Sequence, residues 1–196
     1  MRTIVWDVDD VLNGLMHSWF TKGWKMEHPE CGIEYAELTK NPPHEVLGIA
    51  CEDYLASLDA FRKTKSGIEL TPNVEALDWF TQHGSRFRHI ALTARPLEST
   101  PEVAWWVMRH FGSWIRSFGV VPARIGKEVP LYDNGKGDYL HWLGKGDVLV
   151  DDSEENLAQA VELGIRTVRW PQPWNHSLRN TTETLAEIME IASNCD

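Results

Sequence analysis

The sequence has few cysteines, and their placement excludes two kinds of framework. The 196-residue chain contains three, Cys31, Cys51 and Cys195, which are odd in number, far apart and outside any CxxC pattern. Disulfide scaffolds and structural zinc sites need paired or closely spaced cysteines. We therefore expect free thiols in a reducing compartment. The eight histidines show no HxxxH or HExxH spacing, which argues against a zinc site built on histidine.

Long apolar runs and clusters of positive charge are also absent. No stretch approaches the roughly 20 apolar residues of a membrane span, and residues 1–3 lead directly into a short apolar run rather than a signal peptide. The formal net charge is −10, with no run of Lys or Arg, which makes a long nucleic acid a poor partner. We expect a cytoplasmic protein with no membrane and no long nucleic acid as partner. A small anion held through a metal remains compatible with this charge.

The rest of the composition is typical of one folded domain. Hydrophobic residues make up 42% of the chain and charged residues 24%, as in ordinary globular proteins. A length of 196 residues suits a single domain with room for an insertion. Nothing in the sequence indicates an oligomeric state.

Four short apolar runs predict buried strands. They cover residues 3–7 (TIVWD), 89–93 (HIALT), 147–152 (DVLVDD) and 165–170 (IRTVRW), and 123–126 is a candidate for a further short strand. Helical patterns separate these runs, so strands alternate with helices. This order predicts an α/β fold with a doubly wound, Rossmann-like parallel sheet.

Start and stop signals mark the connecting helices. Thr71 and Pro72 predict an N-cap and a first helical residue, with Gly84 as the stop, and Ser153 predicts another N-cap. Helices are also predicted over the following ranges: 99–112, 137–143, 153–164 and 185–192.

The block at 13–70 interrupts this alternation. Its segment EVLGIACEDYLASLDAFRK places apolar residues at roughly helical spacing. We therefore predict a helical insertion at 13–70 within an α/β core formed by residues 1–12 and 71–196.

Carboxylates gather where the predicted strands end. Asp7 and Asp9 follow the first strand, Thr93 follows the second, and Asp151 and Asp152 follow the DVLV run. The carboxyl ends of parallel strands meet at one edge of the sheet, where ligands bind. One acidic pair could be a simple turn, but two pairs would repel each other unless a cation neutralised them. Oxygen ligands favour Mg²⁺.

These motifs resemble those of the haloacid dehalogenase superfamily of phosphotransferases. WDVDDVLN, ALTAR, a downstream Lys and VLVDDSEEN occur in the family's order, from Asp7 to about Asn156. The block at 13–70 falls where that family places a small helical cap. Within the family, DVDDVLN and the PWN after the last strand look most like the 5′(3′)-deoxyribonucleotidase-like branch.

The resemblance implies a role for each residue. Asp7 would be the nucleophile that forms an aspartyl-phosphate and would also contact Mg²⁺. Asp9 would be the general acid and then the base, with its backbone carbonyl on the metal. Thr93 would donate its hydroxyl to a phosphoryl oxygen. Of Asp151 and Asp152, we favour Asp152 as the direct metal ligand, with the other residue orienting the site.

The family's lysine has three candidates: Lys127, Lys136 and Lys145 all precede VLVDD. We favour Lys136 because it lies just before a predicted helix, as the family's lysine often does, whereas Lys145 lies in a tight turn. A solvated surface lysine is the alternative for each.

Residues beside these motifs have more than one candidate role. Ala94 and Arg95 follow Thr93 and are predicted to bind the phosphate with it, although Arg95 could equally be structural. Many family members have Gly-Thr where this chain has Asp10 and Val11. Asp10 could stabilise a turn, face the cap or contact a metal ligand, and the turn is favoured because Asp suits turns.

The predicted function is a Mg²⁺-dependent phosphomonoester hydrolase that acts on a small phosphorylated metabolite, with a nucleoside monophosphate as one candidate. One alternative is a phospho-receiver signalling module, which also combines clustered Asp, a Thr and a Lys. In a receiver, however, the acidic pair follows the first strand and the phosphorylated Asp follows a later one. A non-catalytic binding protein of the same fold is the other alternative, and the intact acidic positions argue against it.

Overall fold

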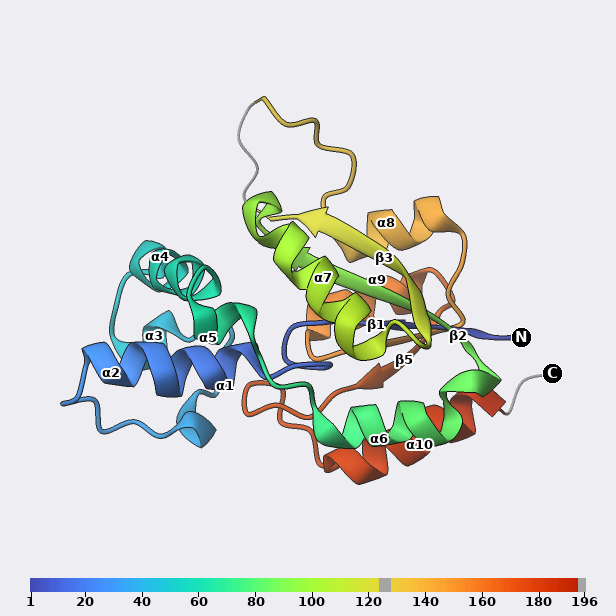
Figure 1. The fold of residues 1–196 in the computed structure, drawn as a ribbon, viewed down its shortest axis with the longest axis horizontal. Helices are drawn as coiled ribbons and strands as arrows, with labels where there is room; N and C mark the ends of the chain where they lie inside the picture. The colour runs from blue at the N-terminus through green and yellow to red at the C-terminus, as the bar shows by residue number, and fades with distance from the viewer. Residues whose placement is uncertain (124–127, 194–196) are drawn as a thin grey trace.

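A five-stranded parallel sheet with helices on both faces forms the centre of the molecule (Figure 1). The computed structural model describes residues 1–123 and 128–193. The strand order is β3-β2-β1-β4-β5, and every neighbouring pair is parallel. The strands are β1 (Thr3–Trp6), β2 (Arg88–Arg95), β3 (Ile115–Pro122), β4 (Val148–Asp151) and β5 (Arg166–Arg169). The predicted α/β fold is confirmed.

The helices divide into two groups along the chain. Those before β2 are α1 (Leu15–Trp19), α2 (Lys25–Glu27), α3 (His44–Leu47), α4 (Cys51–Arg62), α5 (Lys65–Ile68) and α6 (Val74–His83). Those after β2 are α7 (Thr100–Phe111), α8 (Lys136–Leu143), α9 (Glu154–Glu162) and α10 (Thr181–Ser193). Short π and 3-10 segments lie at Phe20–Trp24, Tyr35–Glu37, Gly84–Arg86 and Leu97–Ser99.

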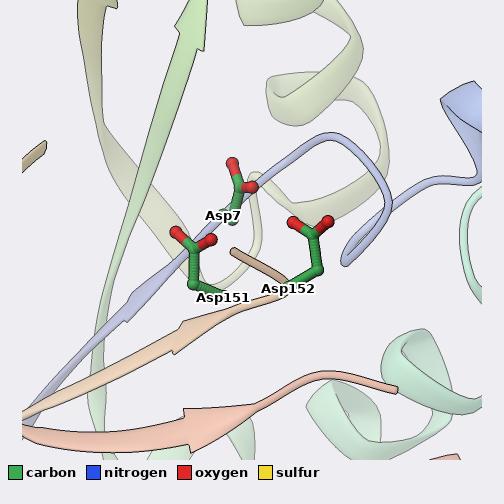
Figure 2. Close-up of side chains that lie close together, drawn as sticks. All are labelled: Asp7, Asp151 and Asp152. Carbon is green, nitrogen blue, oxygen red and sulfur yellow. The ribbon is translucent and has the colours of Figure 1, made fainter. Parts of the chain in front are cut away.

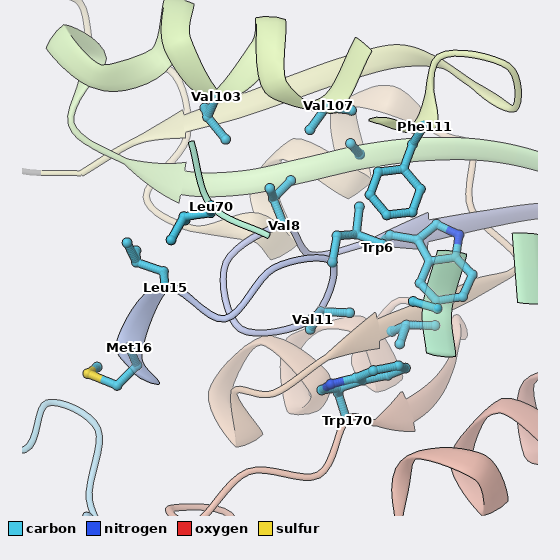
Figure 3. Close-up of a cluster of buried hydrophobic side chains, with 14 of the residues drawn as sticks. Trp6, Val8, Val11, Leu15, Met16, Leu70, Val103, Val107, Phe111 and Trp170 are labelled. Atoms are coloured by element: carbon cyan, nitrogen blue, oxygen red, sulfur yellow. The ribbon is translucent and has the colours of Figure 1, made fainter. Parts of the chain in front are cut away.

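Each face of the sheet has its own core, because side chains alternate along a strand. Trp6 of β1 points into the larger cluster, which α6, α7 and α10 cover (Figure 3). Val5, its neighbour, points into a smaller cluster with Leu140 of α8 and Leu157 of α9. Burial on both faces explains why the central strands are continuous apolar runs.

Helices α1 to α5 lie beyond the carboxyl ends of the strands, at the left of Figure 1. The chain enters this group near Asn13 and returns at Pro72, and these two residues form an isolated antiparallel bridge. The carboxyl edge of the sheet therefore faces a helical layer. The exact division at 13–70 stays a prediction.

One edge strand was not predicted from the sequence. Strand β3 was missed because Arg116, Ser117 and Gly119 interrupt its apolar pattern at the sheet edge. The short strand expected at 123–126 does not include residue 123, and 124–126 lie outside the described residues.

The N-cap of α6 is Asn73 rather than Thr71. The Asn73 side chain accepts a hydrogen bond from the Ala76 amide at 2.9 Å, and its own amide donates to the Leu12 carbonyl at 2.8 Å. Pairing with the chain before α1 keeps Pro72 extended, so the helix begins two residues later than predicted. The Ser153 cap is confirmed by its hydrogen bond from the Asn156 amide.

Cys31 and Cys51 are free cysteines, and Cys195 lies outside the described residues. No helix in 1–123 or 128–193 is both long and apolar enough to cross a membrane.

Candidate active site

The predicted acidic residues meet at the carboxyl edge of the sheet. Trp6 of β1 is in register with Val150 of β4, so Asp7 and Asp151 come next to each other where the two strands end. Oxygen atoms of Asp7, Asp151 and Asp152 lie within 4.8 Å of one another, and the three side chains are buried (Figure 2). A cavity of about 300 Å³ opens over Asp7 and Asp152.

Lys136 is the lysine that the structure brings to this cluster. Its Nζ lies 2.7 Å from Asp7 Oδ1 and 2.7 Å from Asp151 Oδ2, and the residue is only 1% exposed. It begins α8, which packs on the face of the sheet beside these strand ends. Lys145 is exposed and borders a groove with Thr3 and Arg88 at the amino ends of the strands. Lys127 lies outside the described residues.

Both carboxylate oxygens of Asp151 accept hydrogen bonds from the protein. Asp151 Oδ1 accepts from the Ser153 amide at 2.9 Å and from Asn156 Nδ2 at 3.1 Å, while Oδ2 accepts from Lys136 and from the same Asn156 nitrogen. The residue is 0% exposed. Asp151 therefore orients Lys136 and has little capacity left for a further ligand.

Asp152 is held on one side only. Its Oδ2 accepts a hydrogen bond from Trp174 Nε1 at 2.7 Å, and Asn175 Nδ2 donates to its backbone carbonyl at 2.9 Å. Both donors belong to the PWN stretch in the loop after β5. Among the described residues no hydrogen bond reaches Asp152 Oδ1, and Asp152 borders the cavity. This arrangement leaves one carboxylate oxygen for an external partner.

Asp7 likewise has protein partners on only one carboxylate oxygen among the described residues. Its Oδ1 accepts from the Val8 amide at 2.6 Å as well as from Lys136, while Oδ2 receives no hydrogen bond from residues 1–123 or 128–193. Burial raises the pKa of Asp7 well above its usual range, Asp151 and Asp152 add to this, and Lys136 opposes it. Burial and the Asp151 and Asp10 charges raise the pKa of Asp152 to about 8. The cluster therefore carries more carboxylate than one lysine can neutralise.

The same surroundings keep Lys136 charged. Burial alone would lower the pKa of Lys136, but Asp151 and Asp7 outweigh burial and raise it. The site thus holds a permanent, buried positive charge beside Asp7.

Thr93 lies at the carboxyl end of β2 with an unused hydroxyl. The residue is 0% exposed, and its Oγ1 has no hydrogen-bond partner in the described part of the chain. Thr93 and Ala94 both line the cavity. A buried hydroxyl without a partner is costly, so Thr93 is ready to donate to a bound oxygen.

Asp9 is surrounded by arginines instead of carboxylates. Arg95 Nη2 lies 3.1 and 2.9 Å from its two oxygens, Arg62 Nη2 lies 3.9 Å from Oδ2, and Asn13 Nδ2 donates to Oδ1 at 3.2 Å. Burial would raise the pKa of Asp9, but Arg95 and then Arg62 outweigh it and lower the pKa. Arg95 therefore contacts Asp9 and the Ser99 carbonyl, and it is not among the residues that line the cavity above Asp7.

Asp10 stabilises the turn after β1. Its backbone is left-handed, with φ of 64°, and its Oδ1 accepts from the Met16 amide at the start of α1 at 2.8 Å. Gln172 Nε2 donates to its carbonyl at 2.5 Å. The turn interpretation agrees with these contacts, and the side chain also satisfies an amide in the first turn of α1. Burial and the Asp9 charge raise the pKa of Asp10 well above its usual range.

The residues present suit a small divalent cation. Asp7 and Asp152 each offer an oxygen without a hydrogen bond among the described residues, and both have a raised pKa, as expected where charge is not yet compensated. All the donors are oxygens, the type that Mg²⁺ prefers. The Asp9 side chain is not part of this group, so only its backbone could take part.

No protein-family model and no curated protein matches this sequence. Solved structures do match. A haloacid dehalogenase-like hydrolase from Streptococcus pneumoniae superposes with a TM-score of 0.57 and 13% identity, over 95% of this chain and 90% of that one. A haloacid dehalogenase superfamily hydrolase of subfamily IA from Geobacter sulfurreducens superposes with a TM-score of 0.53 and 14% identity, over 88% of this chain and 91% of that one. The chain has a haloacid dehalogenase-like fold.

A haloacid dehalogenase-like fold does not by itself choose a reaction. Protein tyrosine kinase A from Mycobacterium tuberculosis also superposes on this chain, with a TM-score of 0.58 and 13% identity over 91% of this chain and 87% of that one. The neighbours named here do not support the deoxyribonucleotidase-like branch. The reaction must be argued from the side chains of this chain.

Several residues that contact the site were missed from the sequence. Asn156 donates to Asp151, Trp174 donates to Asp152, and Arg62 approaches Asp9. Asn156 and Trp174 lie in the VLVDDSEEN and PWN stretches, which the sequence analysis recognised as motifs without predicting a contact for either residue. Arg62 carried no signal because it comes from α4, whose placement over the sheet only the tertiary structure defines.

Proposed function

We propose that this protein is a Mg²⁺-dependent phosphomonoester hydrolase in which Asp7 is the nucleophile. The observation that supports the proposal most directly is the position of Lys136, between Asp7 Oδ1 and Asp151 Oδ2 at 2.7 Å from each. A buried cation beside a carboxylate that borders a cavity is what attack on a phosphate dianion requires, because both reactants are negative.

In the first step, Asp7 Oδ2 attacks phosphorus and the bond from phosphorus to the ester oxygen breaks. The leaving oxygen takes a proton from Asp9, and an aspartyl-phosphate remains on Asp7. Thr93 Oγ1 donates a hydrogen bond to a phosphoryl oxygen, which would give this buried hydroxyl a partner. Lys136 offsets the charge on the transferring group.

In the second step, water attacks the phosphorus of the aspartyl-phosphate. Asp9 accepts a proton from that water, inorganic phosphate leaves, and the Asp7 carboxylate is restored. Splitting hydrolysis in this way replaces one difficult step by two easier ones. Arg95 and Arg62 lower the pKa of Asp9, which favours the ionised form that accepts the proton in this step.

Asp152 would hold the metal through Oδ1, the oxygen without a hydrogen bond among the described residues. The family resemblance implies that the Asp7 carboxylate and the Asp9 carbonyl would join it. When bound, Mg²⁺ supplies positive charge that offsets the charges of the carboxylates and the phosphate. Asp151 keeps Lys136 in place and does not need to contact the ion.

The test is phosphate release from p-nitrophenyl phosphate with Mg²⁺, compared between the wild type and Asp7→Asn. We expect the variant to lose at least about a thousandfold in kcat. Asp53→Asn, at an exposed position on α4, is the matched control and should keep wild-type activity. Equal rates for the wild type and Asp7→Asn would disprove the role of Asp7.

Acid quenching followed by mass spectrometry separates the proposal from its alternatives. A hydrolase should show transient phosphorylation that maps to Asp7 and disappears as phosphate is released. A receiver-like module would accumulate a stable phosphoryl group, and a binding protein would show none.

A further inference from the structure

The cavity above Asp7 has two chemically different walls. Its floor is the charged carboxyl edge of the sheet. Its opposite wall, which we call the apolar roof, consists of Leu15 and Met16 of α1 and Tyr54, Leu55 and Leu58 of α4. Except for the half-buried Leu55, these side chains are at most 5% exposed. The roof therefore presents carbon to any group that extends away from the phosphate.

Polar groups on the roof side are few, and the charged one is already paired. Besides the Tyr54 hydroxyl, the described lining contains Asn41 at the exposed rim and Arg62. Arg62 Nη1 donates to Asp59 at 2.8 Å, and its Nη2 faces Asp9 at 3.9 Å. The guanidiniums of Arg62 and Arg95 are thus matched by the carboxylates of Asp59 and Asp9, which leaves little attraction for a second anionic group on the substrate.

We infer that the leaving group of the substrate is a compact apolar alcohol or phenol, either aromatic or aliphatic, rather than a sugar, a polyol or a nucleoside. This inference rests on the proposed phosphomonoesterase function. A polyol entering the cavity would exchange hydrogen bonds with water for contacts with carbon, which is unfavourable. An apolar group would gain from the same burial.

The size of the cavity points the same way. Ligand pockets usually measure about 300–1,000 Å³, and this cavity, at about 300 Å³, is at the small end of that range. It must also hold the phosphate and the ion. The space left beneath the roof suits a single ring or a short chain.

The experiment compares primary phosphate esters whose leaving alcohols differ mainly in polarity. With Mg²⁺ present, we expect kcat/KM for benzyl phosphate and n-butyl phosphate to exceed that for glycerol 3-phosphate, ribose 5-phosphate and adenosine 5′-monophosphate by at least tenfold. Binding of benzylphosphonate and 2,3-dihydroxypropylphosphonate, measured by calorimetry, gives a second readout that does not depend on turnover. The apolar phosphonate should bind more tightly.

A pair of leucine variants tests the roof itself. Leu55 and Leu47 are both half-buried and pack against the same core cluster, but only Leu55 is among the residues that line the cavity. Leu55→Asn should lower the ratio of kcat/KM for benzyl phosphate to that for glycerol 3-phosphate at least threefold. Leu47→Asn should leave the ratio unchanged, and any loss of cap packing would affect both variants.

The outcomes separate the two proposals. If phosphate is released from the esters but the polar ones are equal or better substrates, the inference about the leaving group is wrong and the hydrolase function stands. If neither variant changes the ratio, the apolar roof does not select the substrate. If no phosphomonoester is hydrolysed with Mg²⁺, the proposed function itself is wrong.

Discussion

Asp7 and Asp9 are separated only by Val8, yet they face opposite charges. Asp7 shares its surroundings with Asp151 and Asp152, and Lys136 is the cation in contact with it. Asp9 is contacted by Arg95 and approached by Arg62. Burial and nearby carboxylates raise the pKa of Asp7, whereas the arginines lower that of Asp9.

This difference indicates how the two carboxylates divide the chemistry. The Asp7 side has an excess of negative charge that a metal ion would relieve. The Asp9 side is already neutralised by protein groups, and in the proposed mechanism Asp9 transfers the protons. The chain leaves β1 at Asp7 and turns over residues 9–12, and the two side chains lie in different electrostatic environments.

The largest effect should come from removing Lys136. Lys136→Met leaves Asp7 and Asp151 buried without their cation, and losing one partner of a buried pair costs about 3–5 kcal/mol of unfolding free energy. Urea unfolding without metal measures this loss. The exposed Lys145→Met is the matched control and should change the free energy by less than about 0.5 kcal/mol. Equal stability of the two variants would contradict the buried contacts of Lys136.

The second effect is a dependence of stability on pH that metal should remove. A carboxyl whose pKa is higher in the folded state stabilises the protein below its unfolded pKa, and this contribution is lost as pH rises through the folded value. For Asp152 that window runs from about 4 to about 8. Without metal, the unfolding free energy should fall by roughly 3–4 kcal/mol between pH 5 and pH 8.5.

Saturating Mg²⁺ should flatten this profile, because the ion favours the ionised carboxylates. Binding at pH 7 should also release close to one proton per ion, and fewer at pH 9.5. Calorimetry in two buffers with different ionisation enthalpies measures that number. Binding without proton release at pH 7 would show that Asp152 is already ionised.

A smaller effect is expected from Trp174, which orients Asp152. Trp174→Phe removes the indole donor and keeps an aromatic ring, so the Asp152 carboxylate loses its anchor. Loss of such a partner typically weakens metal binding by about 10-fold or more. Calorimetric titration with Mg²⁺ is the measurement. The exposed Trp142→Phe is the control and should bind Mg²⁺ like the wild type.

The smallest effect tests the Asp9 side. Arg62→Gln removes the more distant cation, which raises the pKa of Asp9 and keeps its acid form to higher pH. The alkaline limb of the pH profile of kcat/KM should move to higher pH. At pH 8, kcat/KM should rise about two- to threefold as long as α4 keeps its position. Arg95→Gln should move it further, while Arg95→Lys, which keeps the charge, should move it less. A shift to lower pH would exclude Asp9 as the acid.

Much of the fold was readable from the sequence, and the failures have physical causes. Central strands such as β1 and β4 are buried on both faces, so their composition alone marks them. Strand β3 lies at the edge of the sheet and includes exposed polar residues, so it does not form a continuous apolar run. The N-cap at Asn73 depended on pairing with a segment some 60 residues earlier, which no local pattern contains.

For the site, the carboxylates and the hydroxyl at the strand ends could be predicted from the sequence, because register and parallel topology carry Asp7, Thr93 and Asp151 to one edge. Their contacts could not be predicted, because they depend on how distant elements pack. Lys136, Trp174 and Arg62 come from separate elements, and their distances depend on how α8, the loop after β5 and α4 pack. Packing brings together residues far apart in the chain, so the division between Asp7 and Asp9 appears only in the folded protein.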